Sequence, residues 1–287
     1  MFFFCSQKVK PASRQPDWAR IEESEGTNSL TVVFPPGVEG VIAPFTSARG
    51  WAPRMCAVPG RRSTGQPRGL ALRCANRIPH GRGLGSSSAA IVAGVLAARA
   101  LVVGANERLD DEAALRLAAS IEGHPDNVAA CLLGGYTIAW SDSEGVRALT
   151  LPVAASIVPV VFVPSSQVAT SKARRLLPEQ LPFADAARSA GRAALLTAAL
   201  GGRPDLLLAA TEDRLHQRYR AGAMPRSASL VEQLRLGGVA AVISGAGPTV
   251  LALTDATGAD TVQAQVPRGW TVLRLDVEPA GARIVPL

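Results

Sequence analysis

The stretch Pro79-His-Gly-Arg-Gly-Leu-Gly-Ser-Ser-Ser-Ala-Ala90 decides how the rest of the chain is interpreted. Three glycines within five positions leave a backbone on which no Cβ atom blocks the approach of a bulky anion. Three serines and an alanine-rich apolar run follow, which predicts a buried helix over 86–104 that begins at this loop. Phosphate binds well at a helix N-terminus, where backbone N–H groups are unpaired. The segment therefore predicts a phosphate-binding loop, although a glycine-rich turn can also be a plain tight connection.

Two common phosphate loops are excluded by the residues around this stretch. The Walker loop ends in Gly-Lys-Ser/Thr, and this stretch contains no lysine. The dinucleotide-binding fingerprint requires an acidic residue after a strand about twenty positions further on. Asp110 and Asp111 stand near that distance, but their setting is that of a helix start.

Length favours two domains, which we place at residues 1–150 and 151–287. Strand and helix patterns on both sides of a break near residue 150 indicate an α+β protein. The 287 residues are 47% hydrophobic, enough for two cores. The net charge of +7 is spread over scattered basic residues, so we expect no nucleic-acid partner. Arg99 interrupts the longest apolar run, so we expect no membrane span. Four cysteines without metal or disulfide spacing favour a reducing cytoplasm.

Strand and helix patterns alternate along most of the chain. Strands are expected at 30–34, 38–42, 70–73, 136–140, 156–163, 239–244, 249–253 and 270–277. Helices are expected at 86–104, 110–123, 126–133, 170–177, 182–200, 204–221 and 228–236. Residues 44–68 show neither period and are dense in Arg, Pro, Gly and Ser, which is typical of a flexible basic loop.

Glu122 is a candidate metal ligand because it stands at an unfavourable place. It closes a predicted helix, at the negative end of the helix dipole, where a bound Mg²⁺ would supply the missing positive charge. The alternative is a solvated glutamate. Ser87 or Ser88 can offer a hydroxyl to the same ion.

Polar residues follow at His124, Asp126 and Asn127, where this helix stops. Asn127 is a candidate for holding a substrate hydroxyl, and Asp126 or His124 for contacting an amine or a carboxylate. The alternative to substrate binding is that His124 and Asn127 only cap helix ends.

Two arginines are candidates for binding a carboxylate, because the guanidinium fork matches its geometry. Arg174 lies in a basic cluster, and Arg220 is predicted to share a polar helix face with Asp213 and His216. A solvated face is the alternative for both. Ser244-Gly-Ala-Gly-Pro-Thr249 is either a simple hairpin turn or a place where backbone approaches the phosphate loop.

In their order, these segments resemble the GHMP small-molecule kinases and, within them, the bacterial homoserine kinases, over about 69–287. The segments that carry the resemblance are 79–90, Glu122-Gly-His-Pro-Asp-Asn-Val-Ala-Ala130, Gly134-Gly135, Thr170-Ser-Lys-Ala-Arg-Arg-Leu-Leu-Pro178, Glu212-Asp-Arg-Leu-His-Gln-Arg-Tyr-Arg220 and Ser244-Gly-Ala-Gly-Pro-Thr249. The resemblance implies a first domain like ribosomal protein S5 domain 2, a ferredoxin-like second domain, and a site between them.

The resemblance also implies a reaction, the transfer of the γ-phosphoryl group of ATP to the hydroxyl of L-homoserine in threonine biosynthesis. It implies that Ser87 and Glu122 hold Mg²⁺, and that Asn127 and Asp126 stand at the reacting hydroxyl. His124, Arg174 and Arg220 would then surround the polar ends of the amino acid, and a homodimer fits the family. The residues implied to bind the nucleotide are Pro79, Gly81, Arg82, Gly83, Leu84, Gly85, Ser86, Ser87, Ser88 and Ala89.

The N-terminal 68 residues depart from the family pattern, whose opening segment carries an Asn and an Asp that reach the substrate. Our hypothesis is that part of 1–68 is translated out of frame or from a wrong start. Three alternatives to the function implied by the resemblance remain: a kinase for another small alcohol, a catalytically impaired nucleotide-binding relic, and a basic binding module.

Overall fold

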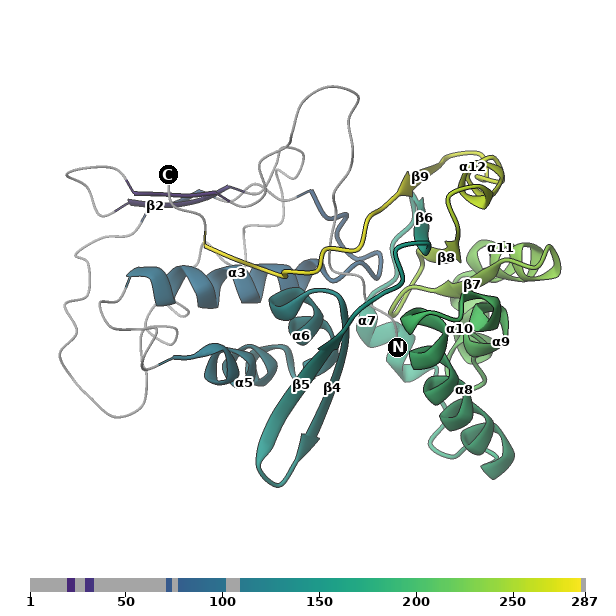
Figure 1. Cartoon of the computed structure of the whole chain (residues 1–287), viewed down its shortest axis with the longest axis horizontal. Coiled ribbons are helices and arrows are strands. Elements are labelled where there is room, and N and C mark those ends of the chain that lie inside the picture. The colour runs from purple at the N-terminus through teal and green to yellow at the C-terminus, as the bar shows by residue number, and fades with distance from the viewer. Residues whose placement is uncertain (1–19, 24–28, 34–70, 74–76, 102–108, 285–287) are drawn as a thin grey trace.

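The fold was analysed in a computed structural model of the whole chain (Figure 1), which describes residues 20–23, 29–33, 71–73, 77–101 and 109–284. The strand expected at 38–42 and the stretch 44–68, on which the out-of-frame hypothesis rests, lie outside these residues. That hypothesis stays a prediction.

The first elements form two small sheets and three helices. Strands β1 (Arg20–Glu23), β2 (Ser29–Val33) and β3 (Ala71–Arg73) form one sheet, in which β1 and β2 are antiparallel and β2 and β3 are parallel. The N-terminal unit, as we call the elements after them, consists of α3 (Ser86–Leu101), α5 (Asp111–Glu122), α6 (Pro125–Leu133) and the antiparallel hairpin β4 (Tyr136–Asp142) and β5 (Gly145–Leu151).

Local chemistry sets the ends of these helices. The Asp110 side chain caps α5 by accepting from the N–H of Ala113 at 2.7 Å. Gly123 ends the helix at φ +86°, a left-handed conformation that glycine adopts without strain. Pro125 then begins α6, at a position where its missing N–H costs no hydrogen bond.

A single apolar core joins the three helices to the hairpin. Val92 and Val95 of α3, Leu115 of α5 and Val128 of α6 are almost fully buried in it. Ala139 and Ala148 of the hairpin pack against the same cluster. The buried central position predicted for the 86–104 helix is confirmed for its described residues.

The second half of the chain forms a four-stranded antiparallel sheet, here called the C-terminal sheet, with the order β7-β8-β6-β9. Its strands are β6 (Val158–Pro164), β7 (Ala240–Ile243), β8 (Val250–Thr254) and β9 (Trp270–Arg274). Helices between β6 and β7, and α12 (Gly258–Gln263) between β8 and β9, complete the β-α-β-β-α-β order of a ferredoxin-like unit. The predicted α+β class is confirmed.

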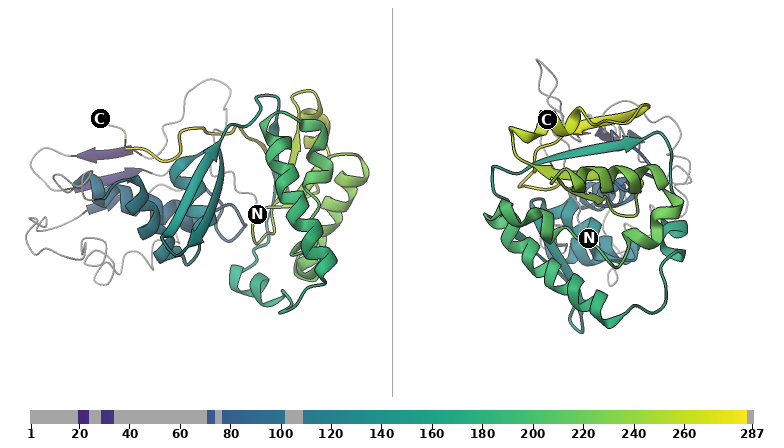
Figure 2. Two further views of the ribbon diagram at one scale, coloured as in Figure 1. Left: turned by 60° about the horizontal axis from the view of Figure 1, so that its bottom comes forward. Right: turned by 90° about the vertical axis from the view of Figure 1, so that its right-hand side faces the viewer.

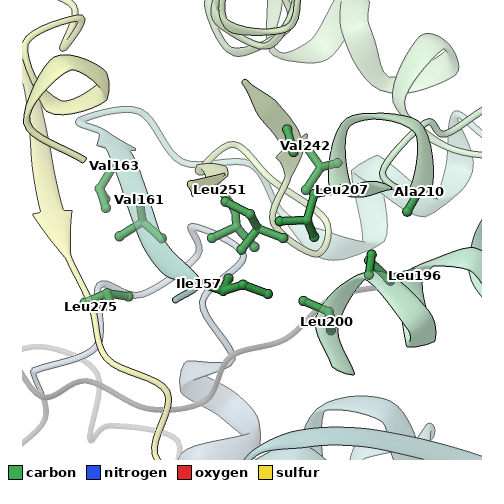
Figure 3. Close-up of a cluster of buried hydrophobic side chains, with 13 residues drawn as sticks. Ile157, Val161, Val163, Leu196, Leu200, Leu207, Ala210, Val242, Leu251 and Leu275 are labelled. Atoms are coloured by element: carbon green, nitrogen blue, oxygen red, sulfur yellow. The ribbon is translucent and has the colours of Figure 1, made fainter. Parts of the chain in front are cut away.

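Helices pack on both faces of the C-terminal sheet (Figure 2). Alternate strand residues face opposite sides, so Val161, Val163 and Leu251 meet one set of helices and Phe162 meets the other. The connecting helices are α7 (Thr170–Arg175), α8 (Phe183–Gly201), η1 (Pro204–Leu206), α9 (Leu207–Ala210), α10 (Gln217–Arg220), η2 (Ala221–Ala223) and α11 (Pro225–Leu236). Figure 3 shows the cluster in which α8 and α9 contact the sheet.

After β9 the chain crosses back to the N-terminal unit, as the yellow segment of Figure 1 shows. The N–H of Gly135 donates to the carbonyl of Glu278 at 2.7 Å, and the N–H of Ala282 donates to the carbonyl of Cys131 at 3.0 Å. The last described residues therefore tie the two halves together.

The structure corrects one predicted element and adds three. The helix predicted over 204–221 is wrong, because the chain leaves the helical path between α9 and α10. Strands β1 and β5 and helix α12 were not predicted. No helix in the described part of the chain is both long and apolar enough to cross a membrane.

We predict that Gly281→Ala lowers the melting temperature more than Gly269→Ala does. Both glycines have a positive φ, +62° and +80°, so both variants carry the same kind of backbone strain. Only at Gly281 would a Cβ lie closer than 3.0 Å to the backbone of α6, at the Leu132 carbonyl; at Gly269 nothing lies within 4 Å. Thermal unfolding of the two variants checks this, and equal melting temperatures would contradict the contact.

Candidate active site

The glycine loop takes a backbone path that only glycine adopts easily. Gly81, Gly83 and Gly85 have φ values of +66°, +73° and +73°. The N–H of Ala89 donates to the carbonyl of Gly85 at 2.9 Å, so the loop runs directly into the first turn of α3. The loop thus ends at a helix N-terminus.

Three consecutive carbonyls of the loop are bound by the C-terminal half of the chain. The carbonyl of Gly81 accepts from the N–H of Val168 at 3.2 Å, and that of Arg82 accepts from the N–H of Thr249 at 3.4 Å. The Ser244 hydroxyl donates to the carbonyl of Gly83 at 2.7 Å. The turn between β7 and β8 is therefore both a hairpin connection and the surface on which the loop rests.

The hydroxyls that follow the loop meet the carboxylate of Glu122. The Ser87 hydroxyl donates to Glu122 Oε1 at 2.7 Å and the Ser88 hydroxyl donates to the same oxygen at 3.0 Å. The Glu122 side chain is 10% exposed, and Ser88 is fully buried. The structure thus brings together the residues predicted to hold a metal, from the end of α5 and the start of α3.

His124, Asp126 and Asn127 lie beside this group at the start of α6. His124 Nδ1 contacts the Asp126 carboxylate, and His124 Nε2 lies 4.0 Å from Glu122 Oε1. The His124 side chain makes no capping hydrogen bond. Asn127 Oδ1 is buried without a hydrogen-bond partner in the described part of the chain. A buried oxygen of this kind costs free energy unless a ligand or water donates to it.

Arg220 lies in the other half of the molecule, beside the β7–β8 turn on which the glycine loop rests. It is 5% exposed, and its guanidinium donates from Nε to the carbonyl of Ala173 and from Nη1 to that of Gly245, both at 3.2 Å. Gly245 directly follows Ser244, which binds the glycine loop. Burial lowers the pKa of Arg220; Asp213 raises it, and the exposed Arg174 lowers it further. The two candidate arginines therefore lie within electrostatic reach of each other.

The segment 211–216 breaks the helix that was predicted there, and an aspartate explains the break. Asp213 Oδ1 accepts from the N–H groups of Leu215 and His216, both at 2.7 Å, which is a side-chain turn that competes with helix. Asp213, His216 and Arg220 consequently do not share a solvated helix face. They line a cavity of about 160 Å³ that also contacts Gly245.

The Asp213 carboxyl is held in its charged form by this turn. Burial acts to raise its pKa, but the hydrogen bonds from His216 and from the two backbone N–H groups outweigh burial, and the pKa is lowered. Glu212 behaves alike: burial raises its pKa, while hydrogen bonds from Arg188, Arg214 and Arg192 lower it more.

Sequence reasoning missed this charge cluster and the side-chain contacts of Arg82. Two of the arginines that bind Glu212, Arg188 and Arg192, come from α8, some twenty positions away, and no sequence period connects them with Glu212. Asp213 was the one sequence signal for the break in the predicted helix, because an Asp side chain can hydrogen-bond to the backbone that follows it and so turn the chain.

Comparisons with known proteins agree with this geometry. The family model of the GHMP kinases N terminal domain matches residues 54–135, and that of the GHMP kinases C terminal domain matches residues 192–271. The homoserine kinase of Streptomyces avermitilis is 62% identical over 223 residues, which are 78% of this chain and 73% of that protein. That of Clavibacter michiganensis subsp. michiganensis is 51% identical over 221 residues, 75% of this chain and 70% of that protein.

The chain belongs to the homoserine kinases of the GHMP kinase superfamily. The family model begins at residue 54, so it reaches further toward the N-terminus than the resemblance over 69–287. Solved structures share the fold: homoserine kinase from Cytophaga hutchinsonii has a TM-score of 0.67 at 24% identity, over 91% of this chain and 85% of that chain. Mevalonate kinase from L. major has a TM-score of 0.58 at 18% identity, over 88% of this chain and 83% of that chain.

We predict that Asp213→Asn lowers the melting temperature at neutral pH and that the difference from the native protein shrinks in acid. The folded pKa of Asp213 lies below the unfolded value of about 3.9, so its contribution is complete above that pH and is lost as the pH falls through the folded pKa. Thermal melts across this range check the prediction. Asp260→Asn, at a side chain that is 86% exposed, is the control. A difference that stays constant down to the lowest pH would contradict it.

Proposed function

We propose that this homoserine kinase transfers the γ-phosphoryl group of ATP to the side-chain hydroxyl of L-homoserine, giving O-phospho-L-homoserine and ADP in threonine biosynthesis. The observation that carries the proposal is the 62% identity to a named homoserine kinase over most of both chains. Residues 1–150 would form the ATP-binding domain and residues 151–287 the C-terminal domain. A cytoplasmic location and a homodimer are expected from the sequence and stay predictions.

The glycine loop and the start of α3 would hold the triphosphate. The carbonyls of residues 81–83 are bound on the side of the C-terminal half, whereas no hydrogen bond among the described residues uses the N–H groups of Gly85 to Ser88. These N–H groups and the positive end of the α3 dipole suit an anion. The same arrangement supports phosphoryl transfer, which depends mainly on positioning and on stabilising charge.

Ser87 and Glu122 are the residues that would hold Mg²⁺. Mg²⁺ in nucleotide sites is bound by one or two protein oxygens together with phosphate oxygens, and hydroxyl and carboxylate oxygens are its preferred ligands. Ser87 Oγ and Glu122 Oε1 lie within 2.7 Å of each other beside the loop, which fits this donor set. The ion would neutralise charge on the phosphates.

The acceptor substrate would lie between the start of α6 and the arginines. Asn127 Oδ1 is free to accept from the homoserine hydroxyl and so to orient it toward the phosphate. The Asp126 carboxylate contacts His124 Nδ1. This contact would fix the imidazole beside the substrate. Arg174 and Arg220 would face the amino acid's carboxylate.

We predict that Glu122→Gln abolishes most homoserine-dependent ADP release and raises the Mg²⁺ concentration needed for half-maximal rate. The amide keeps the shape of the side chain but removes the charge that attracts the ion. Glu112→Gln is the matched control, since Glu112 lies on the same helix, is exposed, and pairs with Arg116 alone among the described residues. Coupled assays at several Mg²⁺ concentrations check the prediction, and a Glu122→Gln enzyme with unchanged Mg²⁺ dependence would contradict the metal role.

We predict that Arg174→Ala raises the KM for homoserine by about tenfold or more, because a charge-assisted hydrogen bond to a carboxylate is lost. The KM for ATP should stay within about twofold of the native value. Arg175→Ala is the control, because Arg175 is the neighbouring exposed residue of α7. If the two variants have equal homoserine KM values, Arg174 does not bind the substrate.

A further inference from the structure

The side chain of Arg82 lies in the middle of the glycine loop but is directed at the C-terminal sheet. Its Nε donates to the carbonyl of Pro164 at 2.8 Å, and its Nη2 donates to the carbonyl of Ser165 at 2.8 Å. Its Nη1 lies 3.3 Å from the carbonyl of His80 at the start of the loop. Pro164 is the last residue of β6, a central strand of the sheet. The guanidinium thus bridges the loop and the sheet.

All three acceptors of Arg82 are backbone carbonyls. No carboxylate among the described residues lies within ion-pair distance of its guanidinium. A guanidinium has five N–H donors in a fixed planar fork. Here two of these donors bind the carbonyls of two successive residues at the end of one strand. Such an arrangement fixes geometry, because neither acceptor can move without breaking a bond to the same rigid group.

The backbone of the loop is held on the same side. The carbonyls of Gly81, Arg82 and Gly83 all accept hydrogen bonds from the segments that follow β6 and β7. A Cβ on Gly83 would lie closer than 3.0 Å to the Ser244 carbonyl, so the loop touches the β7–β8 turn without space between them. The Arg82 side chain extends this contact surface to the end of β6.

We propose that Arg82 is a positioning residue, which holds the glycine loop against the C-terminal sheet so that the loop's N–H groups face the nucleotide. The proposal deepens the proposed function and rests on it for its catalytic consequence. Its structural part, that Arg82 orders the loop before any nucleotide binds, does not depend on which alcohol is phosphorylated.

The glycine content of the loop makes contacts that order its backbone necessary. Three glycines in five positions allow the free loop many backbone conformations, including ones that turn carbonyls toward the phosphates. Ordering that backbone at the moment of binding would weaken the affinity for the nucleotide, whereas a loop ordered in advance avoids the loss. Contacts with the C-terminal half, made by the Arg82 side chain and by the Ser244 hydroxyl, supply this order.

Hydrogen exchange in the nucleotide-free enzyme tests the structural part. Arg82→Ala should speed exchange about tenfold at the amides that donate to the loop carbonyls, here called the loop amides (Ala89, Val168 and Thr249), and leave α5 unchanged, since only the local opening becomes easier. Arg82→Lys should restore part of the protection. Arg226→Ala is the matched control, because Arg226 also donates to a backbone carbonyl, that of Arg268, and stacks on Trp270, while none of its hydrogen bonds in the described part of the chain reaches the glycine loop.

Kinetics of the same variants test the catalytic consequence. Arg82→Ala should raise the KM for ATP by about tenfold and leave the KM for homoserine unchanged. Ser244→Ala, which removes the hydroxyl bound to Gly83, should act in the same direction. Because both residues act through one loop, the double variant should lose less than the two single losses multiplied together.

Two results would overturn the proposal. If Arg82→Ala raises the KM for ATP while exchange of the loop amides in the free enzyme is unchanged, Arg82 acts on the nucleotide directly. If exchange rises equally in the loop and in α5, Arg82 only contributes to global stability. Should the enzyme fail to phosphorylate homoserine, the exchange experiment still decides whether Arg82 orders the loop.

Discussion

The hydrogen bond from the Ser244 hydroxyl to the Gly83 carbonyl, at 2.7 Å, joins the two halves of the molecule at their functional centre. A glycine loop has little conformational preference of its own, so its shape is set by what it touches. On one side it continues into α3, and on the other it rests on the β7–β8 turn, where Gly245 also holds Arg220. One contact surface therefore positions both the backbone proposed to bind phosphate and a candidate substrate arginine.

The charges are divided between the halves in a way that suits phosphoryl transfer. Glu122 and Asp126 lie on the N-terminal unit beside the start of α3, while Arg174 and Arg220 come from the C-terminal half. Under the proposed function, a cation that serves the phosphates would be attracted to the acidic wall formed by Glu122 and Asp126, and a carboxylate of the acceptor would be attracted to the arginines. Asn127 Oδ1, buried without a partner in the described residues, lies on the acidic wall, where the reacting hydroxyl would be oriented.

Sequence patterns predicted most of the fold because its elements have strong local causes. The Asp110 cap, the Gly123 stop and the β-branched run of β6 each act over a few residues. The broken helix at 211–216 was missed because a single side chain, Asp213, overrides an apolar period that is otherwise helical. The Ser87–Glu122 pair was predicted. The hydrogen bonds from Arg82 to the carbonyls of Pro164 and Ser165 were not, because they join residues more than eighty positions apart and no sequence pattern connects them.

Phosphorus NMR of a mixture of the enzyme, ATP, Mg²⁺ and L-homoserine tests the central claim most directly. The account predicts a new phosphomonoester resonance, that of O-phospho-L-homoserine, which grows in step with ADP and is absent when homoserine is omitted. Formation of ADP with inorganic phosphate alone, or no loss of ATP while the nucleotide still binds, would contradict the claim that this site transfers phosphate to homoserine.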